Sequence, residues 1–300
     1  MTVFELIAAG AHTLEDAGVS FGHGTTNAFD ESAWLVLWQL GLPLDSPLQG
    51  EDSVADQVPT PEQHEQVSAL LRSRIESRKP AAYLTHEAWL QGLSFYVDDR
   101  VIVPRSLIAE LLVSGAIDPW LGADTHKVLD LCTGNASLAV FAALAYPAVT
   151  VDASDLSVEA LAVARINLDR YQLRERISLL VSDGLASVRG PYDLILCNPP
   201  YVNAQSMAAL PPEYRAEPSL ALDGNRLGAS DGMDFVRQLL IDAPEQMTDQ
   251  AILVIEIGNE REHFEAAFGN LEAIWLQTSA GEDQVLLLTR DVLLKYVAPK

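Results

Sequence analysis

One stretch restricts the fold of this chain more than any other: an apolar run, 192–197, that ends in Asn198-Pro199-Pro200-Tyr201. The apolar run predicts a buried strand. The prolines must end it, because proline cannot donate to a β-ladder and blocks a helix. The residue before each proline is held extended. The sequence therefore predicts a stiff stub at the carboxyl end of a strand, where open α/β sheets place their ligands.

This stub has the groups needed to bind a planar amino group. The Oδ1 atom of Asn198 and the carbonyl of Pro199 can together accept both hydrogens of an NH2 group, and the carbonyl, which precedes a proline, has no competing local N–H donor. Pro200 keeps the stub stiff, and Tyr201 offers a flat face for stacking. The pattern indicates a site for a primary amide or an exocyclic amine. The structural alternative is a proline-terminated strand followed by a loop tyrosine.

The second half of the chain alternates predicted strands with predicted helices, which is typical of a doubly wound parallel α/β sheet. The predicted strands are 128–132, 149–153, 177–181, 192–197, 252–257, 273–277 and 284–289. The predicted helices are 107–117, 138–145, 158–171, 232–243 and 260–268.

Acidic residues lie in or just after three successive strands of this predicted sheet. Asp130 precedes a small-residue turn, Thr133-Gly134-Asn135-Ala136, that leads into a helix, an arrangement that brings backbone N–H groups onto a ligand. Asp155 comes just past the second strand, where a carboxylate can bind ribose hydroxyls. Asp183 comes just past the third, where it can accept from an adenine amino group. Each aspartate alone is equally typical of a helix cap or an exposed loop.

These motifs resemble a known family. Asn198-Pro199-Pro200-Tyr201 resembles motif IV of S-adenosylmethionine (SAM)-dependent amino-methyltransferases, which modify glutamine amides or the exocyclic amines of adenine and cytosine. The spacing is similar to class I SAM-dependent methyltransferases, whose Rossmann-like sheet has seven strands with the last one antiparallel. The resemblance implies the following cofactor-binding residues: Asp130, Thr133, Gly134, Asn135 and Ala136 for the methionine end, Asp155 and Leu156 for ribose, Asp183 for adenine, and Asn198 beside the methyl group.

Ala136 departs from the family pattern, which has a small, glycine-rich turn here. Alanine brings a Cβ to a place where the backbone approaches the ligand. If this position needs a positive φ, we expect a cost of about 1 kcal/mol. Weakened SAM binding is therefore one expectation from the sequence.

The first 79 residues predict a separate helical domain for recognition of the protein substrate, joined by a hairpin or linker at 80–106 to a methyltransferase domain at 107–300. Thr2, Asp30 and Thr60 are the expected N-caps of three helices. The third helix carries a basic cluster that we expect on its exposed face: Arg72, Arg74, Arg78 and Lys79.

Further stretches narrow the family resemblance to the protein-glutamine methyltransferases. They are 80–84, 92–95, Val103-Pro104-Arg105, Glu110 and 210–218. The resemblance implies that Arg105, Glu110 and Glu217 lie at the substrate pocket. The stretches 22–25 with Asn27, and 95–101, resemble the branch acting on ribosomal protein L-three of the large subunit more than the branch acting on peptide-chain release factors. The segment 223–230 is longer than the family pattern.

The formal net charge of −23 favours a basic partner, here a basic ribosomal protein, over a nucleic acid, because duplex-binding proteins need a basic face. Acidity that serves solubility alone explains the charge equally well. No apolar run is long enough to span a bilayer and no signal peptide is evident, so we expect a cytoplasmic protein without membrane contact. Cys132 and Cys197 follow apolar runs, which favours buried thiols over a disulfide or a metal site.

Two other function classes stay open on the sequence. A nucleic-acid amino-methyltransferase would use the same Asn-Pro-Pro-Tyr chemistry. A ribosome-assembly or regulatory factor that has lost SAM binding is the second, and only Ala136 suggests it.

Overall fold

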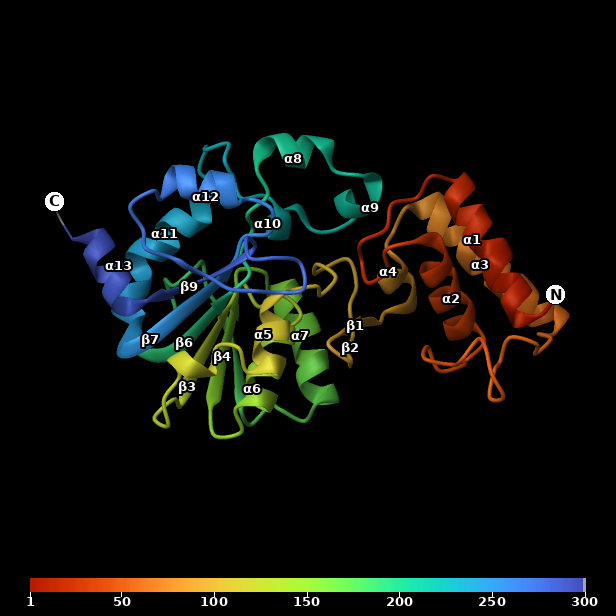
Figure 1. Ribbon diagram of the computed structural model, residues 1–300, viewed down its shortest axis with the longest axis horizontal. Coiled ribbons are helices and arrows are strands. Elements are labelled where there is room, and N and C mark those ends of the chain that lie inside the picture. Colours follow the sequence, from red (N-terminus) through yellow and green to blue (C-terminus); the bar gives the residue numbers. More distant parts are fainter. Residues whose placement is uncertain (299–300) are drawn as a thin grey trace.

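The computed structural model describes residues 1–298, which form two lobes (Figure 1). The larger lobe is built on a seven-stranded sheet of order β5-β4-β3-β6-β7-β9-β8. Only β9 runs against its neighbours, because it pairs antiparallel with both β7 and β8. The predicted α/β class, the seven strands and the antiparallel last strand are thereby confirmed. The strands are β3 (Lys127–Leu131), β4 (Thr150–Asp155), β5 (Ile177–Val181), β6 (Tyr192–Cys197), β7 (Met247–Glu256), β8 (Ile274–Trp275) and β9 (Val285–Thr289).

Helices cover both faces of this sheet because alternate residues of its strands point to opposite sides. Val128 of β3 belongs to the core under one set of helices, and its neighbour Leu129 belongs to the core under the other. One face is covered by α5 (Ile108–Ser114), α6 (Ser137–Ala145) and α7 (Val158–Arg170). The other is covered by α11 (Asp234–Asp242), α12 (Arg261–Ala267) and α13 (Arg290–Val297), the last of which the sequence pattern did not predict.

The N-terminal lobe consists of α1 (Val3–Asp16), α2 (Ala28–Gln39), α3 (Pro61–Ser77) and α4 (Ala81–Thr85). Thr2 and Thr60 form capping boxes, as predicted. The predicted cap of the second helix is wrong: Asn27 caps α2, and its side chain accepts from the backbone N–H of Asp30. Asp30 lies three residues after Asn27, in the first turn of α2, where an acidic side chain interacts favourably with the helix dipole.

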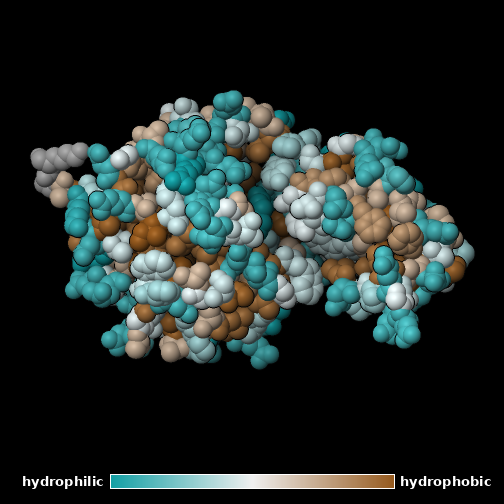
Figure 2. Space-filling model, in the orientation of Figure 1, coloured by the Kyte–Doolittle hydropathy of each residue, from teal (hydrophilic) through white to brown (hydrophobic). Residues whose placement is uncertain are grey.

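The segment 80–106 is packed against the N-terminal lobe. It contains α4, which was not predicted, and a short hairpin of β1 (Ala88–Leu90) and β2 (Leu93–Phe95). Its apolar residues, including Val97, Val101 and Val103, share one core with α1, α2 and α3, and Val163 of α7 joins that core. The two lobes are therefore joined through apolar contacts, although a crease follows their boundary on the face drawn in Figure 2.

The expected exposed basic cluster on α3 needs a correction. Arg72 is exposed as predicted, but Arg74 is fully buried. Its guanidinium donates to Glu31 at 2.8 Å and lies 3.4 Å from a carboxylate oxygen of Glu213. Buried charges need such partners. Glu213 lies 139 residues away in the sequence, in a part of the chain that no local pattern connects to α3.

Three short helices lie between the Asn-Pro-Pro-Tyr stretch and α11, and they reach toward the N-terminal lobe (Figure 1). They are α8 (Ala204–Ala209), α9 (Pro212–Arg215) and α10 (Ser219–Leu222). None of the helices within residues 1–298 is long and apolar enough to cross a bilayer.

Candidate active site

Two cavities meet at the carboxyl ends of the central strands. Parallel pairing aligns Leu131 of β3 with Cys197 of β6, so the turn after β3 lies next to Asn198. Asn198 lines both cavities. Of the two prolines that follow, Pro199 lines one cavity and Pro200 the other. We call the cavity beside Pro200 the cofactor cavity and the cavity beside Pro199 the acceptor cavity.

Five of the predicted cofactor residues line the cofactor cavity: Gly134, Asp155, Leu156, Asp183 and Asn198. They come from the ends of four neighbouring strands, as the strand pattern predicted. Asp155 holds two of the loops together, because its carboxylate accepts from the N–H groups of Gly134 and Ser157, each at 2.9 Å. Burial raises the pKa of Asp155.

Four predicted cofactor residues lie behind the cavity wall. Thr133, Asn135 and Ala136 are buried, and neither they nor Asp130 line the cofactor cavity. Ala136 has the positive φ that the sequence made a concern, 65°. Its side chain, however, is packed in the apolar core under α6 and is not directed at a ligand. The condition for the expected cost of about 1 kcal/mol, a positive φ, is therefore met, while the Cβ itself lies in the core.

Asp130, buried at the end of β3, holds the turn 133–136 by hydrogen bonds. Its Oδ2 accepts from Thr133 Oγ1 at 2.5 Å and from the N–H of Ala139 at 2.9 Å. Its Oδ1 is buried without a partner among the described residues. Burial raises the pKa of this carboxyl to about 7.

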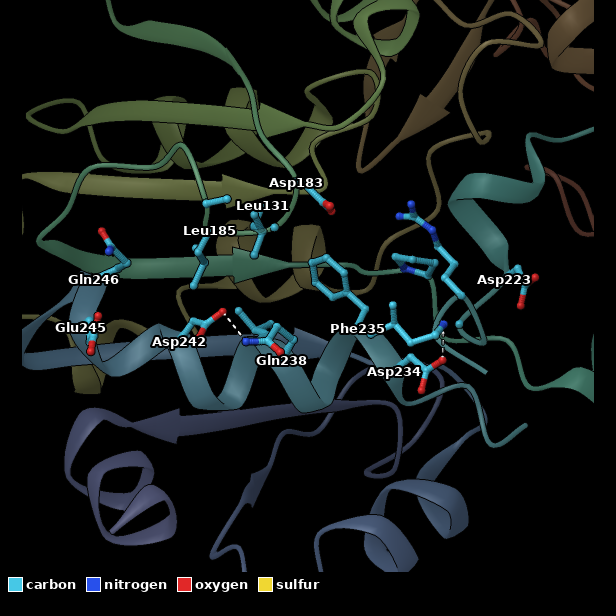
Figure 3. Close-up of a pocket in the computed structure, with 17 residues that line it drawn as sticks. Leu131, Asp183, Leu185, Asp223, Asp234, Phe235, Gln238, Asp242, Glu245 and Gln246 are labelled. Carbon is cyan, nitrogen blue, oxygen red and sulfur yellow. Dashed lines mark hydrogen bonds between the residues drawn. The ribbon is translucent and has the colours of Figure 1, made fainter. Parts of the chain in front are cut away.

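These residues fit SAM. An unpaired carboxylate oxygen lies below the turn, and a Cβ on Gly134 would meet no atom within 4 Å, so the turn's backbone faces open space. Asp155 and Asp183 supply acceptors along the same cavity. Figure 3 shows a further cavity of about 440 Å³ beyond Asp183, between α11 and the loop after β5. Phe235 and Asp183 line both this cavity and the cofactor cavity.

The acceptor cavity has Asn198, Pro199 and Tyr201 along one wall. The Tyr201 ring packs directly on the backbone of Gly258, where an added Cβ would lie 2.7 Å from the ring. Burial raises the pKa of Tyr201, so its hydroxyl stays protonated at neutral pH. The ring is thus held against the backbone of Gly258, which follows β7.

Glu256, at the end of β7, fixes the amide of Asn198. Asn198 Nδ2 donates to Glu256 Oε1 at 3.3 Å. The other oxygen of Glu256 accepts from Ser106 Oγ at 2.5 Å and from the N–H of Leu107 at 2.8 Å. Burial raises the pKa of Glu256, and the hydrogen bonds from Ser106 and Leu107 oppose that rise. With Nδ2 held in this way, Oδ1 of Asn198 is left as the acceptor toward the cavities.

Comparison with known proteins decides the family. The model of the Methyltransferase small domain family matches residues 109–210. A ribosomal protein uL3 glutamine methyltransferase of Burkholderia pseudomallei is 48% identical over 299 residues, covering 96% of this chain and 94% of the relative. Another, of Neisseria gonorrhoeae, is 44% identical over 295 residues, covering 98% and 96%. The chain belongs to the family of ribosomal protein uL3 glutamine methyltransferases.

Membership confirms the predicted enzyme class, a SAM-dependent methyltransferase, and SAM as the methyl donor. Among solved structures, the hMettl16 catalytic domain in complex with the MAT2A 3′UTR hairpin 6 superimposes with a TM-score of 0.51 and 12% identity. That match covers 77% of this chain and 82% of the other. A likeness at this identity shows the fold alone.

The predicted substrate residues occupy three different settings. Arg105 lines the acceptor cavity, and its guanidinium binds both oxygens of Glu217 at 2.7 and 2.8 Å. Glu217 is buried behind the wall; although burial opposes it, His23 and Arg105 lower the pKa of Glu217 to about 2. Glu110 lines neither cavity, and its carboxylate accepts from the N–H of Ser279 at 2.9 Å. Of the three predicted substrate residues, only Arg105 therefore lines the acceptor cavity.

Glu256 is the functional residue that the sequence did not reveal. It ends an ordinary apolar strand and lies 58 residues from its partner Asn198. Its one signal is a charged side chain at the buried end of a central strand, where carboxylates are rare unless they are paired. Both cysteines are free thiols; Cys197 is buried as predicted, whereas Cys132 is only half-buried because it lines the cofactor cavity.

Proposed function

We propose that this protein transfers a methyl group from SAM to the side-chain amide nitrogen of a glutamine in ribosomal protein uL3. One observation carries the proposal: Asn198 stands between the cofactor and acceptor cavities with its Nδ2 held by Glu256. Two acceptors, Asn198 Oδ1 and the Pro199 carbonyl, are then available at the junction. The names of the relatives support uL3 as the substrate.

The chemistry of an amide explains why such a junction is needed. The lone pair of an amide nitrogen is delocalised into the carbonyl, so the nitrogen is a poor nucleophile. Acceptors on both N–H bonds hold the nitrogen in one orientation and favour the positive charge that develops on it. Bound SAM supplies the electrophilic methyl group. The residues of this chain position the amide and stabilise the charge.

The walls of the junction assist in two ways. Glu256 keeps the Asn198 amide from rotating, because a flipped amide would direct Oδ1 at a carboxylate oxygen. Tyr201, seated on Gly258, offers a flat surface against which the glutamine amide can stack. Both contacts are made between residues of the chain itself, and groups fixed in this way make electrostatic stabilisation effective.

We further propose that the N-terminal lobe, residues 1–79, recognises the protein substrate, and that the protein acts in the cytoplasm without sequence-specific binding of nucleic acid. None of the residues that line the cofactor cavity precedes Arg100, so the lobe is free for another role. The net charge of −23 favours a basic protein partner over a polyanion.

Mass spectrometry tests the proposed function. The purified protein is incubated with SAM and ribosomal protein uL3, and parallel reactions contain a peptide-chain release factor, DNA or RNA. We expect one glutamine of uL3 to gain a methyl group on its side-chain nitrogen. Methylation of the release factor or of a nucleic-acid base, with uL3 unmodified, would contradict the proposal.

A further inference from the structure

A buried histidine lies at the junction between the two lobes. His23, in the loop between α1 and α2, is 1% exposed. Its Nε2 lies 3.4 Å from an oxygen of Glu217, and its ring lies 4.2 Å from the ring of Tyr214, centroid to centroid. Neither ring nitrogen makes a hydrogen bond among the described residues, and Nε2 is the one that faces the Glu217 carboxylate. A buried polar side chain in this state needs an explanation, because leaving such a group unpaired is costly.

Both contacts of His23 reach the wall of the acceptor cavity. Tyr214 lines that cavity directly. Glu217 does not, but it holds Arg105, which does, and it also accepts from the N–H of Val103 at 2.8 Å. The guanidinium of Arg105 in turn lies 5.6 Å from the centre of the Tyr214 ring. His23 therefore contacts Tyr214, which lines the cavity, and Glu217, which holds Arg105 at the cavity wall.

The neighbouring residue, Gly22, leaves room for the Tyr214 hydroxyl because it has no Cβ. It has a φ of 126°, and an added Cβ would lie 2.1 Å from the Tyr214 hydroxyl oxygen. The loop is fixed from its other side, because Gly22 donates to the Thr25 carbonyl at 2.8 Å and Thr25 Oγ1 donates to Glu31 of α2 at 3.1 Å. Tyr214 thus rests on a loop that belongs to the N-terminal lobe.

A second link fastens α9 to the same lobe. Glu213, next to Tyr214, lies 3.4 Å from the Arg74 guanidinium and 3.3 Å from that of Arg78. Both arginines belong to the end of α3. Figure 1 shows α9 extended from the sheet lobe to lie beside the N-terminal helices. This part of the acceptor cavity wall is therefore held by the N-terminal lobe.

We propose that His23 and Gly22 are positioning residues for Tyr214 and Arg105, so that the N-terminal lobe sets the shape of the acceptor cavity. The inference rests on the proposed function, in which this cavity takes the glutamine side chain. It gives the loop a role beyond protein docking: a shift of Tyr214 misplaces the glutamine amide relative to Asn198.

Steady-state kinetics of His23→Ala with uL3 at saturating SAM tests this role. We expect kcat to fall by about tenfold to a hundredfold, as small misplacements of reacting groups do. The KM for uL3 and the affinity for SAM should stay near wild type. His23→Gln, which keeps a donor directed at Glu217, should recover part of kcat. A raised KM with unchanged kcat would assign the loop to docking, and a lower melting temperature with unchanged kinetics would assign it to stability; either result overturns the proposal.

A second pair of variants does not depend on how His23→Ala folds. Gly22→Ala should lower kcat because its Cβ displaces the Tyr214 hydroxyl. Gly22→Ala should lower kcat by a smaller factor when it is introduced into Tyr214→Phe than when it is introduced into wild type, because phenylalanine lacks the displaced oxygen. An equal factor in both backgrounds would contradict the proposal. Failure of the wild-type protein to methylate uL3 would instead contradict the proposed function.

Discussion

The Nδ2 atom of Asn198 donates to Glu256 Oε1 at 3.3 Å, and this contact decides which end of the asparagine amide is left for a ligand. Asparagine carries donors on one side and an acceptor on the other. With the donor side directed at a carboxylate, the acceptor side is available at the junction of the two cavities. The hydrogen-bonding character of Asn198 is therefore set by a residue on a different strand.

Glu256→Gln should lower the methylation rate by about a hundredfold, the lower end of the effect of losing a transition-state acceptor. Ser106 and Leu107 both donate to one oxygen of Glu256, so a glutamine would keep its oxygen there and present its NH2 group to Asn198. Two donors would then face each other, and the Asn198 amide would flip.

Single-turnover rates at saturating SAM measure this effect. Glu245→Gln, a change of the same chemistry on a residue that lines neither the cofactor nor the acceptor cavity, is the matched control and should leave the rate unchanged. A wild-type rate in Glu256→Gln would show that Glu256 does not orient Asn198.

Asp130→Asn should change how stability depends on pH. The folded-state pKa of Asp130 is about 7, above the unfolded value of about 3.9. Between these values the folded protein keeps a proton that the unfolded chain releases, so this group lowers the free energy of unfolding as pH rises. The variant has no such titration. Urea unfolding at about pH 5 and about pH 7.5 should therefore show the variant gaining stability relative to wild type at the higher pH. An equal difference at both pH values would contradict the assignment.

Arg74→Ala should destabilise the protein by about 3–5 kcal/mol, because it removes the guanidinium that pairs with the buried carboxylates of Glu31 and Glu213 and leaves them only Thr25 and Arg78. Arg72→Ala, on the exposed side of the same helix, should change the free energy of unfolding by less than about 0.5 kcal/mol. Denaturant unfolding of the two variants compares them directly. Equal effects would mean that the buried ion pairs contribute no more than a surface arginine.

The sheet lobe could be predicted from the sequence because its signals are local. Apolar runs such as 192–197 mark buried strands, and the residues that follow each run mark the site edge. Thr2 and Thr60 lie within three residues of the groups they cap. The pairs that the sequence did not reveal are distant in the chain: Asn198 with Glu256, and Arg74 with Glu213.

The same reason explains the errors on single residues. The spacing on α3 could not show that Arg74 is buried, because its partners, Glu31 and Glu213, are 43 and 139 residues away in the sequence. For Ala136 the sequence raised a positive φ only as a condition, and the direction of its Cβ depends on how α6 packs on the sheet. A motif predicts which backbone groups meet a ligand; it does not predict which side chains lie behind them.

The central claim is that Asn198 accepts a hydrogen bond from the glutamine amide during methyl transfer, and the single-turnover methylation of uL3 by Asn198→Ala at saturating SAM tests it most directly. The loss of one preorganised contact predicts a rate lower by about a hundredfold to a thousandfold. The affinity for SAM should be nearly unchanged, and Asn198→Asp, which keeps an acceptor, should retain more activity than Asn198→Ala. A rate for Asn198→Ala close to that of wild type would contradict the mechanism and leave the Asn-Pro-Pro-Tyr stretch as a structural strand end.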